Sequence, residues 1–155
     1  MNWDMFDSVV AVVLLSGAAT LATIVIRKTK NTAYRAAASV ALLAAFLLIW
    51  INGAVGIIGS EDNDANVMYF ALLAIPVIGA FIARFRPRGL ERTMYVTAAG
   101  QALIAELALM HNLGVDGPIW PRDILMLTAL FIVLWLISAF FFRKAARTTS
   151  VENAV

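Results

Sequence analysis

Five long apolar segments follow one another along this chain, and they constrain its fold more than any other feature. The first and the last, residues 8–26 and 124–142, each hold 19 residues without a charge, about the length needed to cross the hydrocarbon of a bilayer. The pattern predicts an all-α, polytopic membrane protein, a bundle of five transmembrane helices. Residues 1–144 should form one transmembrane domain and residues 145–155 a flexible polar cytoplasmic tail; the expected spans are 8–26, 36–59, 66–83, 93–113 and 124–142.

The composition fits a membrane-embedded chain and excludes several kinds of site. Hydrophobic residues make up 62% of the chain and charged residues 14%, whereas about a quarter of the residues of a soluble domain are charged. Because the chain has no cysteine, it has no disulfide, no thiolate metal site and no cysteine nucleophile. The common phosphate-binding, dinucleotide-binding, zinc-protease and serine-hydrolase signatures are also missing from the sequence. We therefore expect no enzymatic activity, no cofactor and no metal.

The basic residues indicate how the segments are threaded through the membrane. In multi-pass membrane proteins, Lys and Arg in short loops stay on the cytoplasmic side. Five spans with the N-terminus outside and the C-terminus in the cytoplasm put eleven of the twelve basic residues on that side and leave only Arg122 outside. We therefore expect a multi-pass protein of the cytoplasmic (inner) membrane, and its net charge of +2 requires no nucleic-acid partner. The acidic residues that fall outside are Asp4, Asp7, Glu61, Asp62, Asp64, Asp116 and Asp123.

The second and third segments carry two local features. In the second, small or short polar residues recur at steps of three, four and seven, which predicts one helical face on which helix backbones can approach closely. In the third, Pro76 has no N–H to donate to the Leu72 carbonyl, so we expect a kink at Pro76. The residues of the small face are Ala41, Ala45, Asn52, Gly56 and Gly59.

The fourth segment holds the best candidate for a functional side chain, because Glu106 is the only charged residue inside any of the five spans. A charge within a membrane span costs about 2.5–3.5 kcal/mol at mid-membrane and so needs a reason. The rise of a helix places Asn52 of the second segment at a similar depth. We predict a contact between Asn52 and Glu106, with Gln101 and His111 adding polarity nearby.

Two roles remain open for this polar site. Glu106 could bind a proton or a cation in a transport path, or it could hydrogen-bond to an amide and fix the register of two helices. His111 follows five residues later, about 140° around the helix, so it does not share the face of Glu106. As the only histidine of the chain, it is better explained as an interfacial residue than as a metal or haem ligand.

The sequence favours a non-catalytic function. We expect a small integral membrane protein that acts by helix packing, as a homo-oligomer or as an accessory subunit of a membrane complex, with the lipid bilayer around it. The alternative is a proton- or cation-linked channel or carrier in which Glu106 is the intramembrane binding group. The small-residue faces support the first reading, and the lone carboxylate in a span supports the second.

Overall fold

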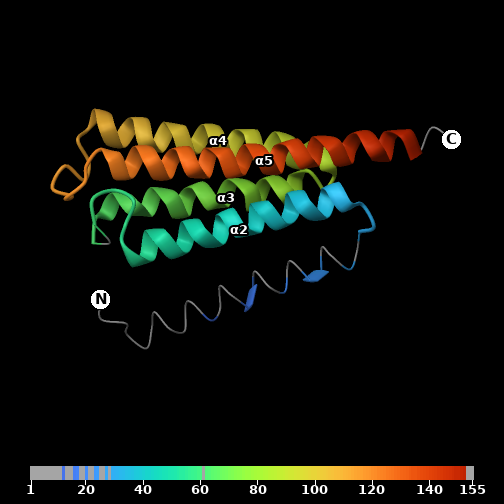
Figure 1. Cartoon of the computed structure of the whole chain (residues 1–155), viewed down its shortest axis with the longest axis horizontal. Helices are drawn as coiled ribbons and strands as arrows, with labels where there is room; N and C mark the ends of the chain where they lie inside the picture. Colours follow the sequence, from blue (N-terminus) through green and yellow to red (C-terminus); the bar gives the residue numbers. More distant parts are fainter. Residues whose placement is uncertain are drawn as a thin grey trace.

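The computed structural model describes residues 29–60 and 62–152, together with Val12, Ser16, Gly17, Thr20, Thr23, Ile24 and Arg27. Within these ranges the chain forms four α-helices and one short 3-10 helix, with no strand (Figure 1). The predicted first span, residues 8–26, falls mostly outside the described residues. The helices are α2 (Thr32–Ala54), α3 (Val67–Ile82), α4 (Pro87–Met110) and α5 (Arg122–Glu152), with η1 (Asp64–Asn66) directly before α3.

All four α-helices fit a membrane protein by length and composition. With η1 counted as the first turn of α3, each is long and apolar enough to cross a bilayer. They lie roughly side by side along the long axis of the molecule (Figure 1). The long helix α5 packs along both α4 and α2, and α3 packs mainly on α4, whereas α2 and α3 touch each other much less. The expectation of an all-helical chain is therefore confirmed for the described residues, and four of its helices are candidate membrane spans.

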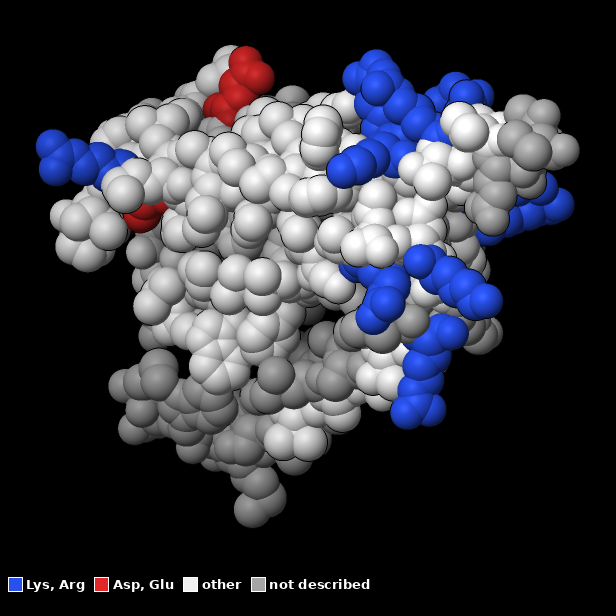
Figure 2. Space-filling model, turned by 45° about the vertical axis from the view of Figure 1, so that its right-hand side comes forward, with Lys and Arg blue, Asp and Glu red and all other residues white. Residues whose placement is uncertain are grey.

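The charged side chains divide the bundle into two ends, which we name by their charge. The basic end holds the start of α2, the connection between α3 and α4, and the last turns of α5. Figure 2 shows Lys and Arg gathered there. The acidic end holds residues 55–60 and 62–63, η1, residues 111–121 and the start of α5; its described acidic residues are Asp62, Asp64, Asp116 and Asp123. The four helices therefore run between ends of opposite charge.

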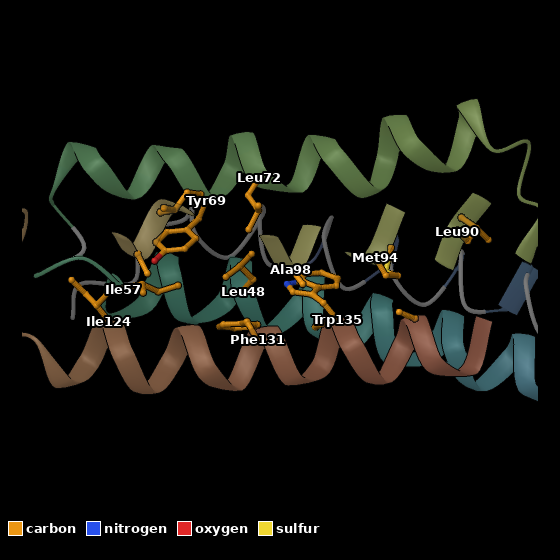
Figure 3. Packing of buried hydrophobic residues seen from close by; sticks show 14 of the residues in the cluster. Leu48, Ile57, Tyr69, Leu72, Leu90, Met94, Ala98, Ile124, Phe131 and Trp135 are labelled. Atoms are coloured by element: carbon orange, nitrogen blue, oxygen red, sulfur yellow. The ribbon is translucent and has the colours of Figure 1, made fainter. Parts of the chain in front are cut away.

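The core combines small side chains on α2 and α4 with large ones on α5. Phe131 and Trp135 are fully buried, and Figure 3 shows them facing Leu48 of α2 and Ala98 of α4. Small residues opposite large ones let the helices approach and leave room for the aromatic rings. A polar contact also joins α5 to α2: the Ser138 hydroxyl donates to the Ala37 carbonyl over 2.8 Å.

The C-terminal region differs from the expected flexible tail. Helix α5 continues as far as Glu152, well beyond its predicted end at residue 142. The extension is held by packing, because Ala145 is fully buried and Ala146 nearly so, and the Asn31 side chain donates to the Ala145 carbonyl over 3.4 Å. Residues 145–152 are therefore helical, and the last three residues lie outside the part of the chain described.

The small-residue face of α2 is shorter than predicted. The helix ends at Ala54, so Gly56 and Gly59 belong to the following loop and not to a helical face. Both have positive φ, 69° and 76°, which favours glycine. Pro76 lies inside α3, which remains one α-helix from Val67 to Ile82. The predicted kink at Pro76 stays a prediction.

Two glycines hold the loops of the acidic end together. Gly114 has φ of +80°, and a Cβ built on it would lie 2.6 Å from the Gly59 nitrogen. We expect Gly114→Ala to lower the free energy of unfolding by roughly 1–3 kcal/mol, because it combines a strained φ with a backbone clash. Unfolding in mixed detergent micelles measures the change.

Gly53→Ala is the matched control for Gly114→Ala. A Cβ at Gly53 meets nothing within 4 Å, and Gly53 is inside α2. There an alanine should raise the stability by about 0.5–1 kcal/mol, because it lowers the entropy of the unfolded chain. Equal effects of the two substitutions would contradict the contact between Gly59 and Gly114.

Candidate functional site: polar side chains within and on the bundle

The buried side chain of Asn66 organises the acidic end. Its Oδ1 accepts hydrogen bonds from the backbone N–H groups of Ile57 and Ile58, over 3.1 and 2.9 Å. Its Nδ2 donates to the Ser60 carbonyl over 2.6 Å. A loop buried in apolar surroundings would otherwise leave these backbone groups unpaired, which is costly. One asparagine thus fixes the path of the chain from α2 to α3.

Asn52 belongs to the same arrangement. It is buried in the last turn of α2, and its Nδ2 donates to the Asn66 carbonyl over 3.0 Å. Its Oδ1 is buried without a hydrogen-bond partner among the described residues. Asn52 therefore links the end of α2 to the start of α3, a structural role that the sequence pattern did not predict.

Glu106 lies on the surface of the described bundle, and the predicted contact with Asn52 is not formed. The buried face of α4 includes Thr97, Gln101 and Ala105, whereas Glu106 and Ala102 are exposed. Each residue of an α-helix is rotated by about 100° from the one before, so Glu106 lies about 140° around α4 from Gln101. When Gln101 faces the interior, Glu106 therefore faces outward. A neutral amide also costs much less to bury than a carboxylate.

Gln101 is the most unusual polar residue of the interior. Its side chain is fully buried near the middle of α4, and neither its Oε1 nor its Nε2 has a hydrogen-bond partner in the part of the chain described. Figure 3 shows Ala98, one turn earlier, beside Trp135 of α5, so Gln101 lies on the face of α4 that meets α5.

Other buried polar atoms accompany Gln101, and the sequence analysis had not selected their residues. They belong to Thr128 and Trp135, which share the buried stripe of α5, and to Tyr69 near the start of α3. The Trp135 indole N–H lacks a hydrogen-bond partner within the described ranges, whereas the Tyr69 hydroxyl of α3 and the Thr128 hydroxyl of α5 lie close to each other. The steps of four, three and four from Ile124 through Thr128 and Phe131 to Trp135 were the available signal.

His111 stands apart from these groups. It is the exposed residue that ends α4, and its backbone N–H donates to the Leu107 carbonyl over 3.1 Å. Among the residues that the structure describes, no three His, Cys, Asp or Glu side chains come together as a metal site would require. Of the predicted polar site, the structure thus buries Asn52 and Gln101 and exposes Glu106 and His111.

A comparison of the chain with known protein families, with curated proteins and with solved structures found no match. The described polar groups buried in the bundle are neutral: they are amides, hydroxyls and indole N–H groups. The Glu106 carboxylate lies on its outer face. Neutral groups of this kind can orient helices and hold water.

The two buried amides should respond to substitution with opposite signs. We expect Asn66→Ala to lower the free energy of unfolding by roughly 2–4 kcal/mol, because it leaves several buried backbone groups unpaired. Gln101→Leu should raise it by about 1 kcal/mol, because leucine has a similar size and no polar atom to desolvate. Unfolding in mixed micelles measures both.

Gln101→Glu is the matched control for Gln101→Leu. It keeps the size of the side chain but replaces the amide by a carboxyl group, so it should lower the free energy of unfolding. If Gln101→Leu were instead as damaging as Asn66→Ala, the Gln101 amide would have to be hydrogen-bonded in the folded protein, contrary to the arrangement described here.

Proposed function

We propose that this protein is a small, non-catalytic integral membrane protein that acts by helix packing, and that it associates with a second copy of itself through the exposed face of α4. The observation that carries the proposal is Glu106, an exposed carboxylate within a membrane-spanning helix. Leu103, Leu107 and Met110 flank it and are also exposed. Lipid chains offer a carboxyl group no hydrogen-bond partner, whereas another membrane helix can.

A second copy satisfies Glu106 by symmetry. Two identical membrane proteins inserted in the same direction are related by an axis along the membrane normal, so the same residue of each copy lies at the same depth. Two Glu106 side chains at such an interface can share a proton and hydrogen-bond to each other. Ala99 and Ala102, exposed on the same side of α4, allow close approach of the backbones.

The orientation in the membrane is part of the proposal. The basic end faces the cytoplasm and the acidic end faces outward, in the cytoplasmic membrane, with a fifth span at residues 8–26 and the N-terminus outside. The gathering of Lys and Arg at one end supports this orientation (Figure 2).

Packing explains the geometry better than the channel or carrier alternative does. A path through the described helices would use the buried polar side chains, Gln101 and Thr128, and Glu106 lies on the opposite side of α4 from Gln101. The carboxylate could take part in transport only at an interface with another chain.

Disulfide cross-linking tests the association. Because the chain has no cysteine, one introduced cysteine reports on one position. We expect Leu103→Cys to form a disulfide-linked dimer in native membranes treated with copper phenanthroline as the oxidant, because Leu103 is 55% exposed beside Glu106 on α4. Adding Glu106→Leu should reduce the dimer fraction several-fold, as expected for the loss of an interhelical hydrogen bond worth about 1 kcal/mol.

Leu130→Cys is the control, since Leu130 of α5 is 45% exposed at a comparable distance from the acidic end. Equal cross-linking at both positions, or none at Leu103→Cys, would refute self-association through α4. If Leu103→Cys is instead cross-linked to a different membrane protein, the same face of α4 binds that protein, and the chain is an accessory subunit and not a homodimer.

A further inference from the structure

A groove between α3 and α4 opens on the surface of the bundle near its basic end. Its volume is about 630 Å³, within the range of about 300–1,000 Å³ common for small-molecule sites. Ile78 and Ile82 of α3 and Val96 of α4 form its sides, and all three are more than half exposed. Both helices are long and apolar enough to cross a membrane, and in that position the groove opens toward lipid.

Small residues create the groove. A Cβ built on Gly79 would lie 2.4 Å from the Thr93 side chain, and one built on Gly89 would lie 2.4 Å from the Cβ of Ala83. The two helices therefore touch almost backbone to backbone along the floor, while the branched side chains of Ile78 and Val96 stand up on either side. The result is a narrow apolar channel that runs along the helices.

The groove ends at a cluster of arginines. Arg92 lines it directly, and Arg84, Arg86 and Arg88 lie in the adjoining connection and the first turn of α4. All four are exposed, and none of them belongs to the one salt bridge of the described residues, which joins Arg143 to Glu91.

The connection that carries these arginines has a defined shape. Arg84 and Phe85 both have positive φ, 51° and 57°, and the Tyr34 hydroxyl donates to the Phe85 carbonyl over 2.9 Å. The ring of Phe85 packs edge-on against that of Phe81, with centroids 5.5 Å apart, and both rings are exposed. Aromatic rings and arginines at the end of a membrane span are typical of the headgroup region.

We propose that the groove binds an anionic phospholipid. One acyl chain lies along the apolar channel between Ile78 and Val96, and the phosphate of the headgroup binds Arg92, with the neighbouring arginines adding to the attraction. Two adjoining features indicate this ligand. The apolar channel, open to lipid, can hold a hydrocarbon chain, and the arginines at its mouth, which form no described salt bridge, can bind a phosphate. The site requires only that α3 and α4 span the membrane and is independent of self-association.

The test compares phosphatidylglycerol with phosphatidylcholine. With the full chain purified in a neutral detergent, native mass spectrometry measures the apparent affinity for each lipid, and thermal unfolding measures the stabilisation that each provides. We expect wild type to prefer phosphatidylglycerol. Arg92→Gln should weaken that preference about fivefold, the contribution of one arginine near a charged headgroup, and Val96→Phe should weaken binding of both lipids by filling the channel.

Two matched variants separate a site from general attraction. Arg122→Gln removes the described arginine of the acidic end, and Leu130→Phe enlarges an exposed apolar residue of α5; both should bind lipid like wild type. Melting in the absence of lipid checks that each variant is folded. Inorganic phosphate alone should give no stabilisation.

Three results would overturn the proposal. The first is equal binding of phosphatidylglycerol and phosphatidylcholine by wild type. The second is that Arg122→Gln weakens the preference for phosphatidylglycerol as much as Arg92→Gln, which would indicate general electrostatic attraction of the anionic lipid. Stabilisation by inorganic phosphate equal to that by the lipid would mean that the arginines bind an anion without the groove.

Discussion

The hydrocarbon of a membrane offers no hydrogen-bond partner, and this constraint decides how the four described helices are built. Within each helix the backbone groups hydrogen-bond to one another. In the buried loop after α2, the Asn66 side chain hydrogen-bonds to the backbone groups of Ile57, Ile58 and Ser60. Most charged side chains lie at the two ends, and most of the described Lys and Arg gather at one of them (Figure 2). The buried polar atoms of Gln101, Thr128 and Trp135 are exceptions that mark the interior between α4 and α5.

Hydropathy predicted each of the four described spans, but it could not predict which face of each helix turns inward. All sides of a membrane helix are apolar, so the contrast that reveals the buried face of a soluble helix is missing. The predicted contact with Asn52 required Glu106 to face the interior, whereas packing buries Gln101 and Ala105. Two helix ends also differ from those predicted. Gly56 and Gly59 lie in the loop after α2, where the Ile58 N–H donates to the Asn66 side chain. Helix α5 continues to Glu152, and Ala145 in this extension is buried by tertiary packing.

The surface of α4 brings together the two roles proposed for this protein. One stretch of the helix carries Glu106 among exposed apolar residues, which suits another protein helix. Another stretch, nearer the basic end, carries Arg92 and Val96 beside α3, which suits a lipid. The buried face of α4 packs on α5, where Ala98 lies beside Trp135 (Figure 3). A single helix can therefore hold the bundle together and present separate surfaces to protein and lipid.

Both proposed surfaces depend on described helices that cross the membrane, with the basic end on one side and the acidic end on the other. Single cysteines introduced by Lys30→Cys and Asp116→Cys, treated in intact cells with a membrane-impermeant maleimide, test this arrangement most directly. We expect labelling of Asp116→Cys in intact cells and of Lys30→Cys only after the membrane is permeabilised. Labelling of both positions from the same side would contradict it.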